Sequence, residues 1–254
     1  MKRLLILAVA AVAVISCLHL NITVETGNGV PVQTTLQLGE FESLSLPSMI
    51  DVVYTQTPGE QSVTFTCDEN LADYYQIRVE NKVLVADTKP GLISLTPRVR
   101  TVVTVNSPVM KGVKVSGSGD CTINGPLTTG DSFSLNISGS GDISVNGQVE
   151  CESLSVSTSG SGDIGISSVV SGTAQFRSSG SGDIGIDAVT ADNIKASTTG
   201  SGDIYLVCKD AGAIDATTSG SGSIYLSGRA LSLRSNSTGS GKVDASGLNL
   251  PVFN

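Results

Sequence analysis

Tryptophan is absent from this chain of 254 residues, and histidine occurs once, as His19. Phenylalanine and tyrosine are also scarce, so aromatic residues make up only 4% of the sequence. With a single imidazole so close to the N-terminus, catalysis by a histidine base or a cysteine–histidine pair is not expected. Basic residues are outnumbered, 15 Lys and Arg against 23 Asp and Glu, and they form no basic patch. Nucleic acid is therefore excluded as an expected partner.

Glycine, in contrast, is abundant, with 29 residues, many of them in a repeated SGSGD motif. The motif first occurs at residues 116–120 and continues with small changes to the C-terminus. Its paired glycines recur every 19 to 22 residues: Gly117/Gly119, Gly139/Gly141, Gly160/Gly162, Gly180/Gly182, Gly200/Gly202, Gly220/Gly222 and Gly239/Gly241. A fixed period of this length is typical of a solenoid. We interpret the motif as a corner, where glycine permits positive φ or a tight bend and the intervening serines stack.

Apolar residues fall into register when the repeats are aligned on their glycines. One column directly follows the Asp position and a second lies two residues later, as in Ile184 and Ile186. Two more columns precede the glycines with the same spacing, as in Ala174 and Phe176. A period of two indicates strands, and each coil can bury its apolar face only against the next coil, about 4.8 Å away. The sequence therefore predicts an all-β fold, a single-stranded parallel β-helix. The six-residue rhythm of left-handed β-helices is missing, so we expect a right-handed one.

The chain divides into four segments. Residues 1–16 have the charged start and short apolar run of a secretion signal. Residues 17–33 are predicted to be a polar tether. Residues 34–110 alternate like strands but lack the glycine period, and we expect them to form an irregular β-rich cap, either as coils or as a separate sheet. Residues 111–254 are predicted to form about seven coils, closed by a C-terminal cap strand within residues 248–253.

The end of the signal segment carries a second pattern. Val14-Ile15-Ser16-Cys17 resembles a bacterial lipobox, in which a cysteine is lipidated and becomes the new N-terminus. The alternative is an ordinary signal peptide followed by an unrelated cysteine. Removal of residues 1–16 takes away Lys2 and Arg3 and leaves 13 basic against 23 acidic residues, a net charge of −10. We predict lipidation at Cys17 and attachment to the membrane through that lipid.

The remaining cysteines carry no clear pairing signal. Cys67, Cys121, Cys151 and Cys208 do not share a column of the repeat, so direct disulfides between neighbouring coils are not implied. We interpret each as a small apolar core residue.

Several motifs together resemble a known family. FESLSLPSMIDVVYTQ, VTVNSP and VKVSGSGD, followed by repeated SGSGDI segments, are similar to the GIN-domain family, described as an auto-transporter adhesin head domain. The similarity covers residues 41–254. It implies a β-helical fold in an exported lipoprotein of the Bacteroidetes type, anchored in the cell envelope at the outer membrane, and it brings no catalytic motif. Ser223 and Lys242 replace the Asp in the last repeats.

The Asp position forms a ladder of carboxylates one coil apart: Asp120, Asp142, Asp163, Asp183 and Asp203. Two unit charges about 4.8 Å apart repel by roughly 0.9 kcal/mol in a water-like dielectric. Hydrogen bonds to nearby backbone or hydroxyl groups, exposure to solvent or a bound Ca²⁺ would offset this repulsion. We predict solvated corner groups that accept hydrogen bonds, with no cofactor; Ca²⁺ binding is the alternative.

Tyr205 and Tyr225 occupy the same outward position in adjacent coils. They are either an aromatic ladder that stabilises the sheet or a platform on which a sugar ring stacks. The rival functional class is a polysaccharide lyase or hydrolase, which needs carboxylates beside basic residues in a cleft built by long insertions. The repeats from Asp120 to Ser246 are nearly uniform. We therefore predict a lipid-anchored, non-catalytic, adhesin-like binding or scaffold module for an extracellular glycan or protein ligand.

Overall fold

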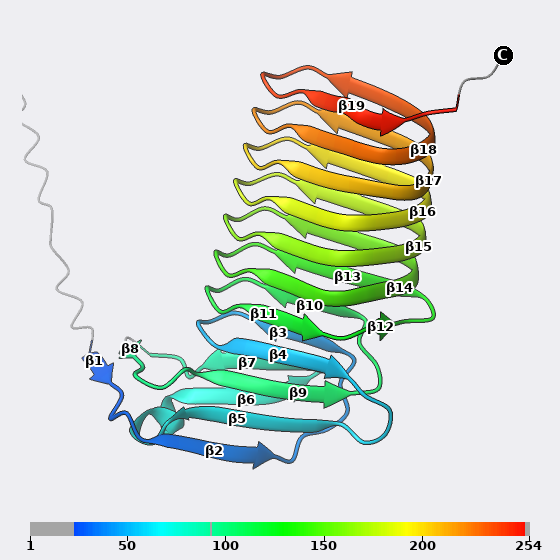
Figure 1. The fold of residues 1–254 in the computed structure, drawn as a ribbon. Helices are drawn as coiled ribbons and strands as arrows, with labels where there is room; N and C mark the ends of the chain where they lie inside the picture. The colour runs from blue at the N-terminus through cyan, green and yellow to red at the C-terminus, as the bar shows by residue number, and fades with distance from the viewer. Residues whose placement is uncertain (1–22, 92, 252–254) are drawn as a thin grey trace, which may run out of the picture.

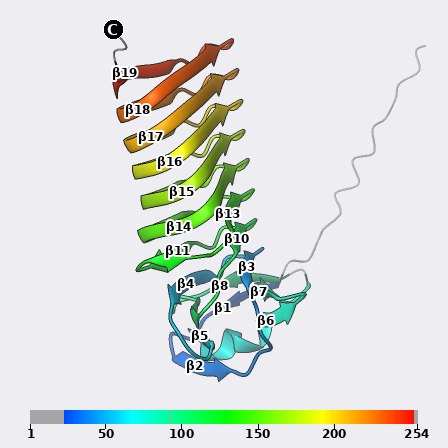
Figure 2. The same ribbon diagram turned by 90° about the vertical axis from the view of Figure 1, so that its right-hand side faces the viewer.

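The computed structural model describes residues 23–91 and 93–251. It is an all-β molecule in which a tall stack of coils continues into a cap whose strands run in mixed directions (Figure 1). In Figure 1 the strands nearest the viewer run to the right, and the strands behind them run back to the left, as the chain rises toward the C-terminus. Figure 2, turned by 90°, shows these front and back strands as two separate faces of the stack. This is the right-handed sense expected for parallel crossovers, so the predicted right-handed parallel β-helix is confirmed.

Most coils consist of one long strand that bends around the core. These strands are β14 (Ile143–Thr158), β15 (Ile164–Ser178), β16 (Ile184–Thr198), β17 (Ile204–Thr218) and β18 (Ile224–Ser237). The start of the stack is divided into the shorter strands β10 (Gly112–Val115), β11 (Cys121–Asn124), β12 (Leu127–Thr128) and β13 (Ser132–Ile137), of which β13 stacks on β10. The strand β19 (Val243–Asn249) ends the stack. Each coil pairs in parallel with the next, in the register that the glycines predict.

The apolar columns predicted from the repeat form the core. Ile184 lies between Ile164 and Ile204 in the parallel ladder, and all three side chains are buried. A further inward column, not predicted from the sequence, contains Val149, Val169, Val189 and Cys208. No coil has an inner layer of its own, so the core is the sum of these stacked columns.

The glycines at the corner are required by the closeness of the coils. A Cβ on Gly182 would lie 2.0 Å from the carbonyl oxygen of Gly162, and the other corner glycines give the same result. None of these corner glycines has positive φ, so that part of the predicted reason is wrong. The serine between the two glycines, such as Ser181, is exposed.

A different hydroxyl ladder lies two residues before the first glycine, and it is buried except at its last member, Ser237. Its members each donate to the carbonyl oxygen of the second glycine of the same corner, at 2.6 to 3.0 Å: Thr158, Ser178, Thr198, Thr218 and Ser237. The inward carbonyl would otherwise lie in an apolar core without a donor, which is costly. The sequence indicated polar residues at these positions but not that they face inward.

The cap combines the two arrangements that the sequence left open. β3 (Ser43–Leu46) and β4 (Asp51–Gln56) form an additional coil directly beneath β10 and β11. Below it, parallel and antiparallel pairs close the end of the solenoid: β2 (Pro31–Leu36), β5 (Ser62–Asp68), β6 (Tyr75–Glu80), β7 (Val83–Thr88) and β9 (Val102–Ser107). A 3-10 helix, η1 (Glu69–Tyr74), joins β5 to β6. The solenoid therefore begins before residue 111.

The described part of the predicted tether is strand. β1 (Thr23–Thr26) pairs in parallel with β8 (Ile93–Thr96), and β2 begins at Pro31 and pairs with β5. The tether prediction is wrong for this part because edge strands are held mainly by backbone hydrogen bonds, which leave no apolar pattern in the sequence.

A buried carboxylate fastens this N-terminal strand region to the cap. Asp68 accepts backbone hydrogen bonds from Gly29, Arg98 and Val99, at 2.7, 2.8 and 2.9 Å. Burial raises the pKa of Asp68, but these three donors outweigh it, so the net pKa is lowered. A Cβ on Gly27 would lie 2.3 Å from this carboxylate, so only glycine fits there.

The cysteines of the described chain are core residues. Cys67, Cys121, Cys151 and Cys208 are buried with free thiols. Burial raises the pKa of each thiol, to about 12 for Cys121 and about 11 for the other three. Thiolate chemistry is therefore disfavoured at all four.

The described residues contain no helix long and apolar enough to cross a membrane.

Candidate ligand-contact face

Two tyrosines stand on the flat face formed by the first halves of the coils. Ile204 and Leu206 point into the core, so Tyr205 between them points outward, and Tyr225 does the same one coil later. The parallel ladder places them in one outward column with Gly165 and Gly185 before them and Asp244 after them. The structure thus brings the two predicted residues together on one surface.

The two rings stack closely. Their centroids lie 4.9 Å apart and their planes differ by 5°. The Tyr225 ring is partly covered from the other side by Lys242, whose Nζ lies 5.7 Å from the ring centroid and binds Asp244 at 2.9 Å. Tyr205 is 43% exposed. The column is therefore covered at its upper end by a cation and open at the Tyr205 end.

A carboxylate fixes the orientation of the exposed ring. The Tyr205 hydroxyl donates to Asp203 Oδ2 at 2.9 Å. This hydrogen bond is the main cause that raises the pKa of Tyr205 to about 12. Because the ring is held by the hydrogen bond on its edge and by Tyr225 on one face, little conformational entropy remains to be lost when a ligand binds to the other face.

The Asp column runs along the corner beside the tyrosines. The Oδ1 atom of each Asp accepts a hydrogen bond from the backbone N–H of the equivalent residue one coil later: Asp120 from Asp142, Asp142 from Asp163, Asp163 from Asp183, Asp183 from Asp203 and Asp203 from Ser223, at 2.7 to 2.9 Å. Asp51 of the cap accepts from Asp120 at 3.0 Å and so extends the column downward. The carboxylates act as the backbone hydrogen-bond acceptors that the sequence suggested.

The column does not gather its carboxylates around one point. Among the described residues, no group of three or more His, Cys, Asp or Glu side chains is arranged to hold a metal ion. Each Oδ1 is already used by a backbone donor, which reduces the oxygens available to a hard cation such as Ca²⁺. The predicted lack of a cofactor and the Ca²⁺ alternative both stay untested, and a calcium titration followed by thermal unfolding distinguishes them.

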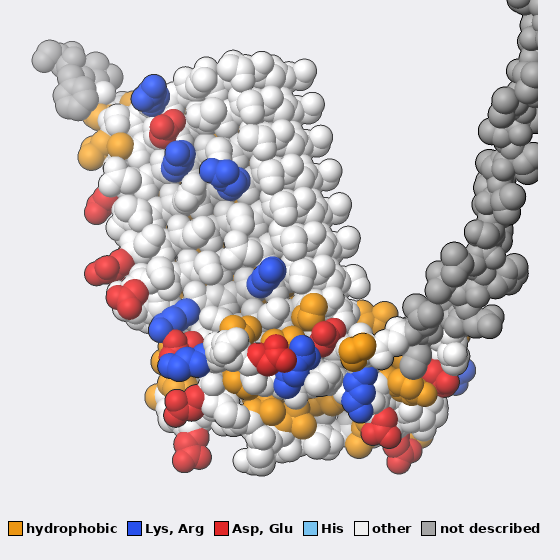
Figure 3. Space-filling model, turned by 180° about the vertical axis from the view of Figure 1, so that it is seen from behind, with side chains coloured by type: hydrophobic (Ala, Val, Ile, Leu, Met, Phe, Trp, Pro, Cys, Tyr) orange, Lys and Arg blue, Asp and Glu red, His pale blue; other side chains and the backbone are white. Residues whose placement is uncertain are grey.

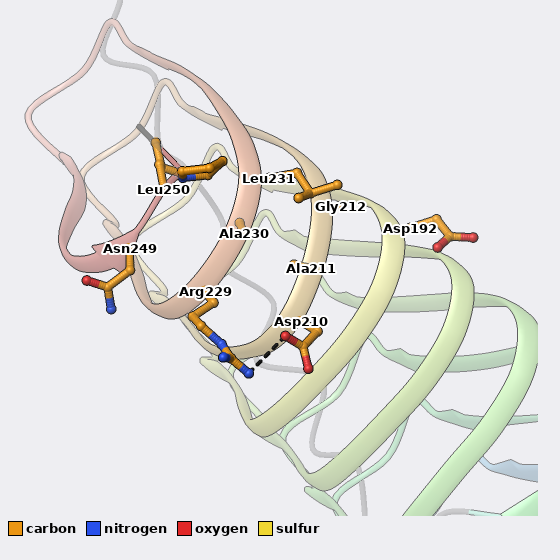
Figure 4. Close-up of a pocket in the computed structure, with 10 residues that line it drawn as sticks. Asp192, Asp210, Ala211, Gly212, Arg229, Ala230, Leu231, Asn249 and Leu250 are labelled. Carbon is orange, nitrogen blue, oxygen red and sulfur yellow. Dashed lines mark ion pairs between the residues drawn. The ribbon is translucent and has the colours of Figure 1, made fainter. Parts of the chain in front are cut away.

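A hollow of about 530 Å³ opens near the C-terminal end, around the bend between the two halves of the last coils (Figure 4). Its floor is small and apolar, with Ala211 and Ala230, while Leu231 and Leu250 are 67% and 43% exposed. On its rim Arg229 pairs with Asp210 at 2.9 Å. The strand β19 pairs with β18 only as far as Arg229, so no described strand covers residues 230–237. The C-terminal cap strand predicted within residues 248–253 therefore covers only part of the last coil in the described chain, which ends at residue 251.

The opposite face differs from the tyrosine face. Seen from behind, the coils present mostly uncharged side chains with a few basic and acidic ones, and charges of both signs are denser on the cap (Figure 3). The exposed basic residues on these returning strands are Arg177, Lys195 and Arg234. The flat aromatic surface is therefore confined to the first halves of β17 and β18.

The carboxyl groups with shifted pKa values do not resemble general acids. The pKa of Glu42 is lowered to about 2, mainly by its hydrogen bond to Lys111 and then by that to Lys82. The pKa of Asp244 is likewise lowered, chiefly by Lys242. A glycosidase acid needs the opposite shift, toward neutral pH.

Some features of this surface were missed from the sequence. Gly165 and Gly185 occupy the same repeat position as Tyr205, a match that the glycine alignment contained but that the sequence interpretation did not use. The hydrogen bond from Tyr205 to Asp203 needs two side chains to lean toward each other, which the residue spacing does not reveal. Cys17, the predicted lipidation site, lies outside the described residues.

Comparisons with known proteins agree with this architecture. A crystal structure described as a "putative adhesin" from Bacteroides fragilis matches with a TM-score of 0.77 and 24% identity, over 87% of this chain and 99% of that one. A "putative lipid binding protein" from Parabacteroides distasonis gives 0.73 and 23%, over 91% and 100%. A "putative adhesin" from Parabacteroides merdae gives 0.65 and 26%, over 87% and 98%. Among curated proteins no sequence matches.

A family model covers most of the sequence directly. It matches residues 40–211 and again 175–252, which include the additional coil of the cap and all the SGSGD corners. The predicted resemblance is therefore confirmed, and the chain belongs to the family described as "Putative auto-transporter adhesin, head GIN domain".

Proposed function

We propose that this protein is an exported, lipid-anchored module of the cell envelope that binds an extracellular ligand through the tyrosine face and catalyses no reaction. The observation that carries the proposal is the stacked, partly exposed pair Tyr205 and Tyr225 on an otherwise flat and rigid solenoid. Membership of a family named for adhesin heads supports a binding role. The described carboxyls with shifted pKa values support the absence of catalysis, since all of these shifts are downward.

The solenoid suits this role physically. Its coils repeat without long insertions between β14 and β18, so the outward side chains are fixed by a ladder of backbone hydrogen bonds on both sides. A surface that does not rearrange loses little entropy on binding. The similar structures carry two different descriptions, adhesin and lipid binding, so the ligand class has to come from this chain's own surface.

Replacement of both tyrosines tests the binding face. Tyr205→Ala/Tyr225→Ala should weaken capture of glycan or matrix ligands at least tenfold on an array, because the rings are the exposed apolar contact. Thermal unfolding should change little, since neither side chain lies in the core. Tyr74→Ala, in η1 of the cap, is the matched control. Undiminished capture by the double variant would contradict the proposal.

The polysaccharide-enzyme alternative is tested on the same protein. Incubation with acidic and neutral polysaccharides should release no reducing or unsaturated ends. Turnover that disappears in Asp163→Asn or Asp183→Asn, with ligand capture retained, would replace the binding proposal by an enzymatic one.

The lipid anchor is tested in the exporting bacterium. Cys17→Ala should lose the acyl group detected by mass spectrometry and leave the membrane fraction. Retention in the membrane without any lipid would refute the anchor but leave the binding face untouched.

A further inference from the structure

The aromatic column on the tyrosine face stops abruptly. Tyr225 and Tyr205 stack, but the next two positions of the column, one and two coils earlier, are Gly185 and Gly165. A Cβ built on either glycine would meet no atom within 4 Å. The ring face of Tyr205 that points away from Tyr225 is therefore directed toward open space above two side-chain-free positions.

We call this open surface position the Gly185 slot. Its upper wall is the Tyr205 ring, held by Asp203 at 2.9 Å, and its floor is the backbone at Gly185 and Gly165. Since neighbouring coils lie about 4.8 Å apart, two empty positions leave room for one ring of ordinary thickness stacked beneath Tyr205. A ligand ring there would continue the ladder that the two tyrosines begin.

Carboxylates flank the slot on both sides. Asp183 precedes Gly185 by two residues and Asp187 follows it by two, so both lie on the same outward face. Asp183 uses Oδ1 to accept the Asp203 N–H at 2.7 Å, and its Oδ2 has no hydrogen bond to another described residue. Asp187 is exposed and has no hydrogen bond in the described chain. The slot thus offers an apolar wall with acceptors at its edges.

We infer that the Gly185 slot binds a single pyranose ring of a neutral or amino sugar; this inference rests on the proposed binding function. A pyranose presents an apolar C–H face to an aromatic ring and hydroxyl groups around its rim, which matches one wall and two lateral acceptors. An ammonium group on the sugar gains charge-assisted hydrogen bonds to Asp183 or Asp187, whereas a uronic acid meets like charge. With one ring as the anchor, the expected dissociation constant for a tetrasaccharide is on the order of 1 mM.

Filling the slot from the protein side is the most direct test. Gly185→Phe places a third ring beneath Tyr205, and the free space at Gly185 makes the fold tolerant of it. Binding of chitosan tetramer and cellotetraose, measured by saturation-transfer NMR and calorimetry, should weaken at least tenfold, while thermal unfolding is unchanged or slightly later. Gly130→Phe is the matched control, because its Cβ position is equally open and lies far along the chain in a loop.

Two further variants keep the result informative if Gly185→Phe does not fold. Asp187→Asn should weaken chitosan tetramer several-fold, and Asp187→Lys should raise the affinity for tetragalacturonate relative to chitosan tetramer. Neither change touches a hydrogen bond of the described chain.

Three outcomes overturn the inference: binding within twofold of the unaltered protein in Gly185→Phe, tighter binding of tetragalacturonate than of chitosan tetramer, or no binding of any of the three saccharides. If a ligand no longer binds Tyr205→Ala/Tyr225→Ala but still binds Gly185→Phe, the inference about the Gly185 slot is wrong. The proposed binding function of the tyrosine face then still holds.

Discussion

The corner of the coil stack and the corner of the cap follow the same path with different sequences. In the stack the path is SGSGD, and between β3 and β4 it is Pro47-Ser48-Met49-Ile50-Asp51. Gly119 N–H donates to Ser48 O at 2.9 Å, just as Gly141 N–H donates to Gly117 O at 3.2 Å one coil later. The backbone geometry of the corner therefore does not itself demand glycine.

The difference lies in what is underneath. A Cβ on Gly119 would lie 2.1 Å from Ile50 O, and a Cβ on Gly141 would lie 2.1 Å from Gly119 O. Below the cap corner the described residues form no further corner of this kind: Asp51 N–H donates to Thr101 O at 3.1 Å, and Ile50 is fully buried. Glycine is needed where one corner stacks on another, and the cap corner, which does not rest on such a corner, is free of this requirement.

The two regions also differ in how their cores are filled. The cap uses large and varied side chains, including an edge-to-face pair, Phe65 and Tyr75, with ring centroids 5.4 Å apart. The coils use aliphatic columns in which each layer resembles the next, such as Ile164, Ile184 and Ile204. Because the core of the coils repeats, its pattern can be recognised in the sequence. The cap has to end the repeat, so its sequence departs from that pattern.

The largest expected effect is on the shared column that runs through both regions. Ile184→Ala should lower the free energy of unfolding by about 2 to 5 kcal/mol, because it opens a cavity between two identical layers that are held rigidly by backbone pairing. Val52→Ala, in the same column within the cap, removes less volume and should cost less. Urea unfolding measures both. A loss below roughly 0.5 kcal/mol in Ile184→Ala would contradict the assigned core.

The second prediction separates corner glycines from glycines on the face. Gly182→Ala should cost about 1 to 3 kcal/mol, because its Cβ would lie 2.0 Å from the Gly162 carbonyl oxygen and two coils must move apart. Gly185→Ala, three residues later in the same coil, meets no atom and should change stability by no more than about 0.5 kcal/mol. Equal effects in thermal unfolding would mean that coil spacing is not what selects glycine at the corner.

The fold of the coils was largely predictable from sequence. Alignment on the glycines was enough to place four apolar columns, the outward tyrosine pair and the Asp ladder, because every layer repeats the same environment; it missed the inward column of Val149, Val169 and Val189. The alternating pattern of residues 34–110 also predicted that the cap is built from strand segments, as β5 and β7 show. The order in which those segments pair was not predictable, since it depends on contacts between residues far apart in the chain.

The candidate site was predicted only in part. Tyr205 and Tyr225 follow from the repeat, but the emptiness above Gly185 depends on the absence of neighbouring side chains, which no local pattern records. Asp68 was missed for a related reason. Its three donors come from two separate loops, at Gly29 and at Arg98 and Val99, and a single carboxylate in a strand gives no sign of them.

The third prediction concerns the hydroxyl ladder, which the cap lacks. The same position is Leu46 in the cap. It is Val115 and then Ile137 at the start of the stack, and it becomes Thr158, Ser178 and Thr198 in the coils that follow. Thr198→Val keeps the shape but leaves the Gly202 carbonyl without its donor at 2.9 Å, so it should cost about 1 kcal/mol in urea unfolding. Thr199→Val, at the exposed neighbouring position, is the control. Equal free energies of unfolding for the two variants would indicate that water donates to the Gly202 carbonyl in place of the Thr198 hydroxyl.

The smallest expected effect is at the junction between the two regions. Glu42 binds Lys82 of the cap at 2.7 Å and also pairs with Lys111, just before β10. Both lysines are mostly exposed, so the pairs contribute little at neutral pH and in salt. The pKa of Glu42 is nevertheless lowered from 4.5 to about 2.

Because this folded-state pKa is depressed, the stabilisation by Glu42 is present above the unfolded-state value and is lost as pH falls from about 4.5 to about 2. Glu42→Gln has no charge to lose, so its unfolding midpoint should fall less steeply than that of the unaltered protein in this window and be only slightly lower at pH 7. Thermal unfolding at a series of pH values measures this difference, and a high-salt series should shrink it. Parallel pH profiles for the two proteins would show that the junction is held by the continuous backbone ladder from β3 to β10 alone.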